Sequence, residues 1–330
     1  MTSYVLGVDA GGTKTLAALA DDAGRILGVG IGGPGNWDGV GTERAGRSLN
    51  QAVGGALAAA GGALPSAVFA GIAGVVTEAG RQVARGLLAP TLGQACGVAE
   101  IDHDCRVALA GGLSGQPGIV LIAGTGTACF GRTADKREWR SSGWGSLFGD
   151  EGSSYWIVVQ AIRAVLRADD GRSPRTGLRA ALLPALGVTN ADEILGEATR
   201  GRWDRTSIAA LAPLVIQTAK AGDCIARDLV AEAAGELADA VVAVSRALEF
   251  DQAPVDVAGV GGFLRSSEVW SGLKSRLEGA LPQASLIEPQ LTPVAGAALL
   301  AIARLRDTTA EALPQDVVES LRHSGMQFGL

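Results

Sequence analysis

The stretch that decides the fold is VLGVDAGGTKT, residues 5–15. Its apolar run ends in one carboxylate, Asp9, and the Gly11-Gly12 turn follows at once. Such a turn exposes backbone N–H groups with no Cβ in the way. It can therefore cradle phosphate oxygens while Asp9 holds a Mg²⁺ ion, directly or through water. A hairpin turn with an incidental aspartate is the alternative interpretation of the same residues.

The spacing around this turn differs from the common phosphate motifs. A P-loop requires Gly-x-x-x-x-Gly-Lys-Ser/Thr, and a dinucleotide fingerprint requires Gly-x-Gly-x-x-Gly, and both open a helix. Here residues 15–20 favour a second strand, and a polar turn follows at residues 21–25. The phosphate turn is therefore predicted to lie between two antiparallel strands.

The composition is that of a large globular chain. At 330 residues it can form two domains, and an apolar fraction of 47% argues against disorder. The net charge of −6 disfavours a nucleic-acid partner. No signal peptide and no apolar span of membrane length is evident, so we expect a cytoplasmic enzyme with no membrane partner. Four scattered cysteines without a Cys-x-x-Cys pair make a zinc site improbable.

The order of elements along the first third is an α/β pattern. Strands are expected at residues 4–9, 15–20, 26–31, 67–72 and 99–101, and helices at 43–60, at 78–89 and from about Asp104. A second strand–turn–strand unit, IVLIAGTGTACFG at residues 119–131, mirrors the opening unit. This indicates an internal repeat with a period of roughly 115 residues, and coincidence in a glycine-rich chain is the alternative.

The remainder of the chain is predominantly helical in pattern. Helices are expected at residues 151–167, 191–199, 207–220 and 224–250, a strand at 255–260, and helices from about Ser266 and at 293–306. The pattern of residues 308–330 is ambiguous.

Four segments together resemble the actin-like superfamily of sugar kinases and ATPases. Residues 9–15 are similar to its first phosphate motif, GTGT at 124–127 to its second, and VAGVGG at 257–262 to its adenosine motif. The run GWGSLFGDEGSSYW at 143–156 resembles the N-acetylglucosamine kinase branch, which also contains the BadF/BadG/BcrA/BcrD ATPases. The resemblance covers residues 4–305.

The resemblance implies the architecture and the reaction. It implies an α/β fold of two ribonuclease-H-like domains that face a nucleotide cleft. The first domain would comprise residues 1–115, joined by a C-terminal helix at about 293–330, and the second residues 116–292 with a helical insertion. The implied activity is phosphorylation of an amino sugar by ATP with Mg²⁺, and the implied assembly is a homodimer.

The catalytic base is expected just before the second phosphate motif. A sugar hydroxyl is a poor nucleophile, so phosphoryl transfer needs a proton acceptor beside it. The resemblance places this aspartate at the start of a helix, in the segment IDHDCRVA at 101–108. Asp104 fits the pattern best, Asp102 is its rival, and a helix N-cap is the structural alternative for Asp104.

The resemblance also assigns the substrate contacts. On the sugar side these are Asn36, Trp37, Asp104, Trp144, Gly145 and Asp150, and an N-cap is the structural alternative for Asp150. On the nucleotide side they are Gly11, Gly12, Thr13, Lys14, Gly124, Thr125, Gly126, Thr127, Gly261, Gly262 and Ser266, with Asp9 as the metal ligand. For Lys14 the alternative is a side chain that points to solvent from a strand, and this alternative is slightly favoured.

Three further functions compete with N-acetylglucosamine phosphorylation at the 6-hydroxyl. The first is a glucosamine kinase, in which Asp38 beside Asn36 would hold the ammonium group. The second is an ATPase activator of a radical dehydratase, which needs an iron–sulfur cluster held by cysteines such as Cys96 and Cys105. The third is a non-catalytic sugar sensor, against which the intact Asp9, Asp104 and glycine–threonine loops argue.

Overall fold

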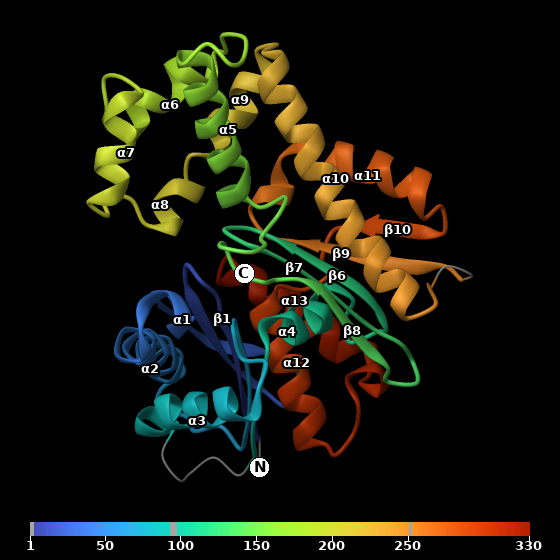
Figure 1. The fold of residues 1–330 in the computed structure, drawn as a ribbon. Helices are drawn as coiled ribbons and strands as arrows, with labels where there is room; N and C mark the ends of the chain where they lie inside the picture. Colours follow the sequence, from blue (N-terminus) through green and yellow to red (C-terminus); the bar gives the residue numbers. More distant parts are fainter. Residues whose placement is uncertain (1–2, 93–97, 251–252) are drawn as a thin grey trace. The chain divides into compact units, whose positions relative to one another are not determined.

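The computed structural model describes residues 3–92, 98–250 and 253–330 (Figure 1). The chain divides into two compact units. The first comprises Met1–Val120, Phe130–Glu138 and Ile287–Leu330, and the second comprises Leu121–Cys129 and Trp139–Leu286. The C-terminal segment therefore packs with the N-terminal residues, from which it is distant in the sequence.

The first sheet has the order β3-β2-β1-β4-β5. Its strands are β1 (Tyr4–Ala10), β2 (Thr15–Asp21), β3 (Ile26–Gly32), β4 (Ala67–Ile72) and β5 (Val98–Asp102). The pairs β1–β2 and β2–β3 are antiparallel, and β1–β4 and β4–β5 are parallel. The predicted hairpin around the first phosphate turn is thus confirmed.

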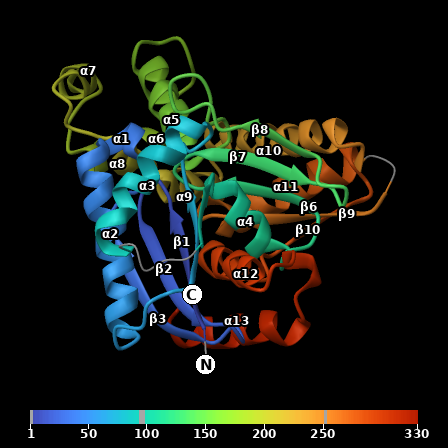
Figure 2. The same cartoon turned by 90° about the horizontal axis from the view of Figure 1, so that it is seen from below.

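Helices bury both faces of this sheet (Figure 2). Leu6 and Val8 of β1 lie in a core with α2 (Thr42–Ala59) and α3 (Glu78–Leu92). Val5 lies in a second core with α12 (Pro293–Leu305) and α13 (Gln315–Gln327). Neighbouring strand residues point to opposite faces, which explains why the strand sequences are apolar throughout instead of alternating. Two short helices, α1 (Trp37–Val40) and α4 (Asp104–Gly112), follow β3 and β5.

The second sheet repeats the first in strand order. Its order is β10-β9-β6-β7-β8, which corresponds strand by strand to β5-β4-β1-β2-β3. The strands are β6 (Gly118–Ala123), β7 (Thr127–Arg132), β8 (Glu138–Ser142), β9 (Val255–Val260) and β10 (Ala284–Ile287). The α/β fold class is confirmed, and the shared order supports the internal repeat.

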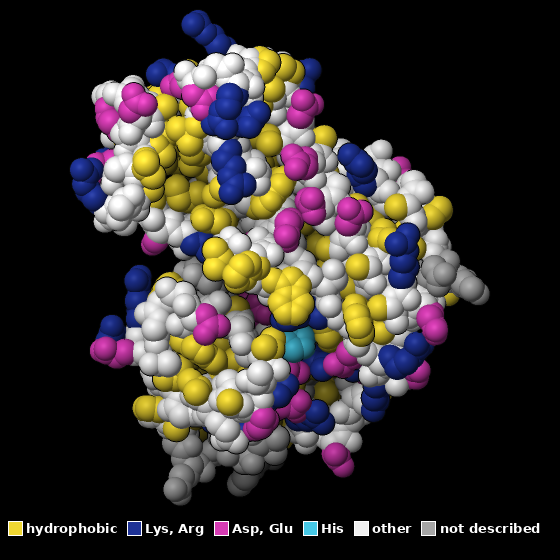
Figure 3. All heavy atoms as spheres, in the orientation of Figure 1, with side chains coloured by type: hydrophobic (Ala, Val, Ile, Leu, Met, Phe, Trp, Pro, Cys, Tyr) yellow, Lys and Arg dark blue, Asp and Glu magenta, His cyan; other side chains and the backbone are white. Residues whose placement is uncertain are grey.

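Seven helices of the described residues belong to the second unit. They are α5 (Ser154–Asp169), α6 (Leu178–Leu186), α7 (Asp192–Thr199), α8 (Arg205–Ala209), α9 (Ala212–Lys220), α10 (Cys224–Ala247) and α11 (Ser267–Ala280). Helix α5 packs against α6, α8, α9 and α10, and α10 packs against α11. Figure 3 shows hydrophobic side chains (yellow) exposed over the region of α5 to α8.

Several sequence expectations need correction. The single helix expected at 207–220 is two helices, α8 and α9, because Pro213 has no N–H to continue an unbroken hydrogen-bond ladder. The helix expected to reach residue 250 ends at Ala247, and Glu249 adopts a positive φ of 60°. Strands β8 and β10 and helix α6 were not expected, since these short segments carry little periodic signal.

The close contact between β1 and α12 gives a stability prediction. A Cβ at Gly7 would lie 2.6 Å from the carbonyl oxygen of Val294 and 2.9 Å from the carbonyl carbon of Ala297. Because both are backbone atoms, Gly7→Ala should destabilise the protein by about 2 kcal/mol or more. Gly54→Ala, in α2 with nothing within 4 Å, is the matched control and should stabilise it by about 0.5–1 kcal/mol. Urea unfolding midpoints measure both; equal effects would contradict the packing argument.

Two expectations concern membranes and cysteine chemistry. Among the described residues, none of the helices combines the length and the apolar character needed to cross a bilayer. Cys96, one of the cysteines considered for the iron–sulfur alternative, lies outside the described residues.

Candidate active site

The first phosphate turn lies between β1 and β2 and is fixed from both sides. The N–H of Gly11 donates to the carbonyl of Lys14 at 3.0 Å, which closes the turn. The carbonyl of Gly11 accepts from the N–H groups of Gly35 and Asn36 at 3.0 and 3.4 Å. Gly12, Thr13 and Lys14 are exposed. The turn is therefore held in place while its tip faces solvent, and it adjoins the predicted sugar contact Asn36.

Asp9, near the end of β1, has a perturbed carboxyl. Its pKa is raised to about 7, chiefly by burial and in addition by the neighbouring Asp104 carboxylate, while Lys14 opposes the rise. The structure therefore places Asp9 and Asp104 close enough to influence each other, although the two residues are 95 positions apart in the sequence. Asp9 lies near the end of β1, and Asp104 is the first residue of α4. Two hard oxygen donors of like charge fit a divalent cation such as Mg²⁺, which would relieve their repulsion.

The rival aspartates Asp102 and Asp104 have different surroundings. Asp102 forms ion pairs with Arg81 at 3.2 Å and with Arg106 at 3.0 Å, and accepts from the N–H of His103 at 2.9 Å. Burial raises the pKa of Asp102, but His103 and Arg106 outweigh it and hold this pKa below its ordinary value. A carboxylate engaged in this way is a weak base with few free lone pairs. The geometry therefore favours Asp104 over Asp102.

Asp104 occupies the first turn of α4. The N-cap position belongs to His103, whose side chain forms no cap hydrogen bond. One carboxylate oxygen of Asp104 accepts from the N–H of Cys105 at 3.0 Å. The helix N-terminus favours the ionised carboxylate at this position. Asp104 is half-buried, so it lies within reach of a ligand.

Asn36 caps a helix in addition to its predicted sugar contact. Its side-chain oxygen accepts from the N–H of Asp38 at 3.0 Å, which makes it the N-cap of α1. Trp37 is half-buried and packs on the core beneath α2 and α3. Asp38 and Asn36 both lie beside Gly74, where an added Cβ would come within 2.9 Å of an Asp38 oxygen. The first unit thus brings the residues Asn36, Asp38 and Gly74 together.

The second phosphate loop, residues 124–127, lies between β6 and β7 in the second unit. The N–H of Gly124 donates to the carbonyl of Gly126 at 2.9 Å, and the N–H of Ser154 donates to the carbonyl of Gly124 at 2.9 Å. The hydroxyl of Thr127 is buried without a hydrogen-bond partner among the described residues. An unpartnered buried hydroxyl is costly, which points to a polar ligand at this loop.

Asp150 lies against this second loop. It is 3% exposed, adopts a positive φ of 62°, and accepts from the N–H of Thr127 at 3.2 Å. The predicted N-cap alternative for Asp150 is wrong, because Ser153 caps α5 by accepting from the N–H of Trp156. Arg205, which sequence reasoning missed, forms an ion pair with Asp150 across 55 positions of the chain. No local sequence pattern signals this pair, because the two residues are 55 positions apart.

The loop before Asp150 exposes aromatic and aliphatic side chains. Trp144 is 69% exposed with Arg140 stacked over its ring, and Leu147 and Phe148 are about as exposed. Gly145 adopts a positive φ of 79°. An exposed indole can stack on a sugar ring, which is the predicted function of Trp144.

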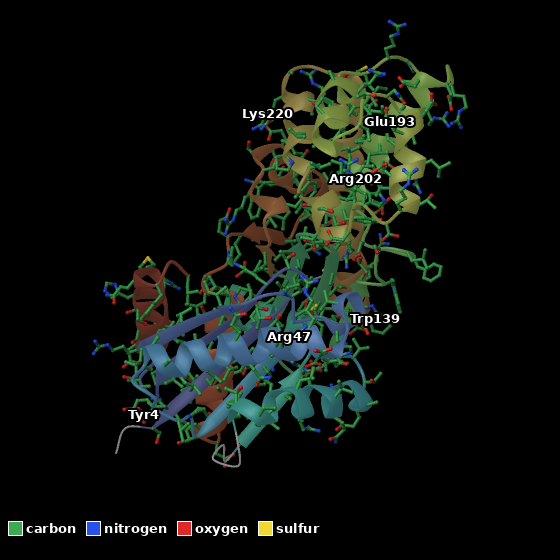
Figure 4. The ribbon with its side chains drawn as sticks, turned by 90° about the vertical axis from the view of Figure 1, so that its left-hand side faces the viewer. Tyr4, Arg47, Trp139, Glu193, Arg202 and Lys220 are labelled. Atoms are coloured by element: carbon green, nitrogen blue, oxygen red, sulfur yellow. The ribbon has the colours of Figure 1, made fainter. Side chains whose placement is uncertain are left out.

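The predicted adenosine contacts lie at the end of β9. Gly261 and Gly262 follow that strand directly, and the hydroxyl of Ser266 donates to Glu268 at 2.9 Å. Glu268 also pairs with Lys220 at 3.1 Å, and Lys220 is labelled in Figure 4. Both line a cavity of about 490 Å³ between α9, α10 and α11, together with Arg227 and Gly272. This cavity is large enough for part of a nucleotide.

The predicted site residues therefore form two sets, each within one unit. The first unit holds Asp9, Gly11, Gly12, Thr13, Lys14, Asn36, Trp37 and Asp104. The second holds Gly124, Thr125, Gly126, Thr127, Trp144, Gly145, Asp150, Gly261, Gly262 and Ser266.

Comparison with known proteins identifies the relatives of the chain. Residues 6–301 match the BadF/BadG/BcrA/BcrD ATPase family. The chain is 30% identical to the N-acetylmuramic acid/N-acetylglucosamine kinase of Clostridium acetobutylicum, over 90% of this chain and 98% of that protein. It is 29% identical to the N-acetyl-D-glucosamine kinase of Dictyostelium discoideum, over 90% and 97%.

Solved structures agree with the sequence comparison. A candidate N-acetylglucosamine kinase from Chromobacterium violaceum superposes with a TM-score of 0.72 at 30% identity, covering 90% of this chain and 98% of that one. A ROK family glucokinase from Streptomyces griseus, in complex with glucose and AMPPNP, gives a TM-score of 0.60 at 20% identity, over 92% and 99%. The latter supports the fold alone.

Proposed function

Because the chain belongs to the BadF/BadG/BcrA/BcrD ATPase family, we propose that it transfers the γ-phosphoryl group of ATP to the 6-hydroxyl of N-acetylglucosamine. The observation that carries the proposal is the likeness to named amino-sugar kinases over nine-tenths of the chain. The proximity of Asp104 and Asp9 supports it, because phosphoryl transfer needs a base and a metal ligand near each other.

In the proposed mechanism the chain positions two substrates and moves one proton. Asp104 accepts the proton of the attacking sugar hydroxyl, which raises the nucleophilicity of its oxygen. Asp150, with Asn36 and the face of Trp144, orients the sugar so that the hydroxyl and the phosphoryl group are in line. The turn at residues 11–14 and the loop at 124–127 offer N–H groups and threonine hydroxyls to the phosphates.

Asp9 is the proposed ligand of Mg²⁺. A Mg²⁺ ion supplies neutralisation of the phosphate charge that develops during transfer. The fit of Asp9 to this ion rests on its hard oxygen donors and its raised pKa, which a cation would lower. Gly261, Gly262 and Ser266 remain the proposed adenosine contacts. The division into residues 1–115 with 293–330, and 116–292, the cytoplasmic location and the homodimer also remain predictions.

A coupled ADP-release assay with a panel of amino sugars tests the function. We expect turnover that requires the sugar, with N-acetylglucosamine the best substrate. ATP hydrolysis that is independent of every sugar would contradict a kinase and favour an ATPase activator. The absence of both turnover and hydrolysis, with intact sugar binding, would favour a sugar sensor.

Glucosamine is the second candidate substrate, and Asp38 favours it. This exposed carboxylate lies beside Asn36 and Gly74, where it could accept from the ammonium group that glucosamine carries and N-acetylglucosamine lacks. Asp38→Ala should therefore raise the KM for glucosamine roughly fivefold or more and leave the KM for N-acetylglucosamine unchanged. Steady-state kinetics on both sugars measure this. An unchanged KM for glucosamine would remove Asp38 from the site.

A further inference from the structure

Arg205 reaches the second phosphate loop from a distant part of the chain. It is the first residue of α8, beyond the α7–α8 connection that carries Arg202 (Figure 4). Its Nη2 donates to Oδ2 of Asp150, whose Oδ1 accepts from the N–H of Thr127. A Cβ at Gly126 would overlap Nη2 of Arg205 and lie 2.8 Å from Oδ1 of Asp150. The guanidinium, the carboxylate and the loop backbone are therefore in direct contact.

The position of Asp150 creates an electrostatic conflict. The loop at 124–127 is the proposed contact for a triphosphate, and a buried carboxylate bonded to its backbone would repel that anion. The repulsion is strong because Asp150 is 3% exposed and little screened by solvent. Asp150 offers both oxygens as acceptors to sugar hydroxyls only when it is ionised, because protonation turns one oxygen into a donor.

Arg205 is well placed to resolve this conflict. An arginine is always protonated, so its pair with Asp150 carries no net charge. The side chain of Arg205 is 35% exposed, whereas its Nε is buried without a hydrogen-bond partner among the described residues. Asp204 fixes the start of α8 as its N-cap by accepting from the N–H of Ser207 at 2.7 Å. Arg205 therefore projects from an ordered helix terminus and retains one buried donor for a ligand oxygen.

We propose that Arg205 is a positioning residue that balances the charge of Asp150 at the second phosphate loop. The loop can then receive the triphosphate while Asp150 remains ionised and oriented for the sugar. This inference rests on the proposed sugar-kinase function. Arg205 makes sugar binding by Asp150 compatible with nucleotide binding by the adjacent loop at residues 124–127.

Nucleotide affinity measured without sugar tests the charge balance. The dissociation constant of Mg·AMPPNP is determined by calorimetry at pH 8. Arg205→Gln leaves Asp150 uncompensated and should weaken binding about tenfold. Asp150→Asn leaves the cation alone and should strengthen binding several-fold, roughly threefold. The double variant, with neither charge, should bind within about threefold of the parent.

Two further variants are controls. Arg205→Lys keeps the positive charge and should retain most of the affinity. Arg200→Gln removes an exposed arginine of the same segment, which pairs with Glu197 at 2.7 Å, and should change nothing. Thermal unfolding of each variant shows that it is folded.

Defined outcomes overturn the proposal. Unchanged nucleotide affinity in folded Arg205→Gln would do so, as would a double variant as weak as Arg205→Gln alone. If Arg205→Gln does not fold, the affinity of Asp150→Asn decides, and weakened or unchanged binding there rejects the proposal. Sugar turnover by the parent enzyme is measured separately. Failure of the proposed kinase function can therefore be distinguished from failure of the charge-balance proposal, because the nucleotide affinities test only the latter.

The pH dependence of the sugar KM is a second readout. Burial raises the pKa of Asp150; the guanidinium of Arg205 and the N–H of Thr127 offset this in part, and Glu151 adds to the rise. Removal of Arg205 raises this pKa further. On acidification the sugar KM of Arg205→Gln should therefore begin to increase at a higher pH than in the parent. If the sugar KM of Arg205→Gln and of the parent had the same pH dependence, Arg205 would not keep Asp150 ionised, and the proposal would be contradicted.

Discussion

Asp104→Asn should lower kcat at least ~10²-fold and leave the KM for the sugar nearly unchanged. The amide keeps the size and the hydrogen-bonding reach of the side chain but cannot take the hydroxyl proton. Asp104 lies in the first turn of α4, beside Asp9. Steady-state kinetics with N-acetylglucosamine and ATP measure both parameters. A variant with near-normal kcat would exclude Asp104 as the base.

Asp102→Asn is the matched control for this experiment. Asp102 is bonded to Arg81 and Arg106, so its loss leaves two cations without their partner and should lower the melting temperature. We expect less than about tenfold loss of kcat, because its carboxylate is not the proposed base. The opposite pattern would be a stable but inactive Asp102→Asn protein together with an active Asp104→Asn protein. That result would make Asp102, and not Asp104, the catalytic base.

Asp9→Asn should reduce kcat/KM for ATP about 10³-fold, since the metal loses its proposed carboxylate ligand. Mg·AMPPNP should raise the melting temperature of the parent protein and not that of Asp9→Asn. An equal rise in both proteins would show that Asp9 does not hold the metal.

The same substitution should stabilise the ligand-free protein at high pH. The folded-state pKa of Asp9 is raised from 3.8 to about 7, so the folded protein binds a proton that the unfolded chain releases. The stability contributed by this proton is complete below about pH 4 and is lost as the pH rises through about 7. At pH 8 Asp9→Asn should therefore melt about 2 °C higher than the parent, and the gain should shrink towards pH 4. If Asp9→Asn melted at a lower temperature than the parent at pH 8, burial would be excluded as the cause of the raised pKa of Asp9.

Much of the fold was predictable because the signals are local. The apolar runs that become β1, β2, β4 and β6 end at Gly or Gly/Thr turns, and a strand followed by such a turn is specified by its own residues. The two glycine–threonine hairpins also revealed the repeat that the two sheets share. The short strands β8 and β10 were missed because four or five residues with mixed polarity carry no clear period.

The surroundings of the acidic residues were not predictable in the same way. The segment at 101–108 contains two aspartates two positions apart, and either fits the start of a helix. Arg81, from α3, and Arg106, one helical turn onward, engage Asp102 only after β5 and α4 have packed. Likewise, Ser153 and not Asp150 caps α5, since Asp150 adopts a left-handed backbone conformation and turns its carboxylate to the loop at 124–127.

The amino-acid order alone thus determined the α/β class, the two phosphate hairpins and the kinase-like motifs, because each depends on neighbours within a few positions. Tertiary structure alone decided which carboxylates form ion pairs with arginines and which can act on a substrate or a metal ion. The partner of Asp150 lies 55 positions away, and burial sets the pKa of Asp9, so both depend on how distant segments pack and how far water is excluded.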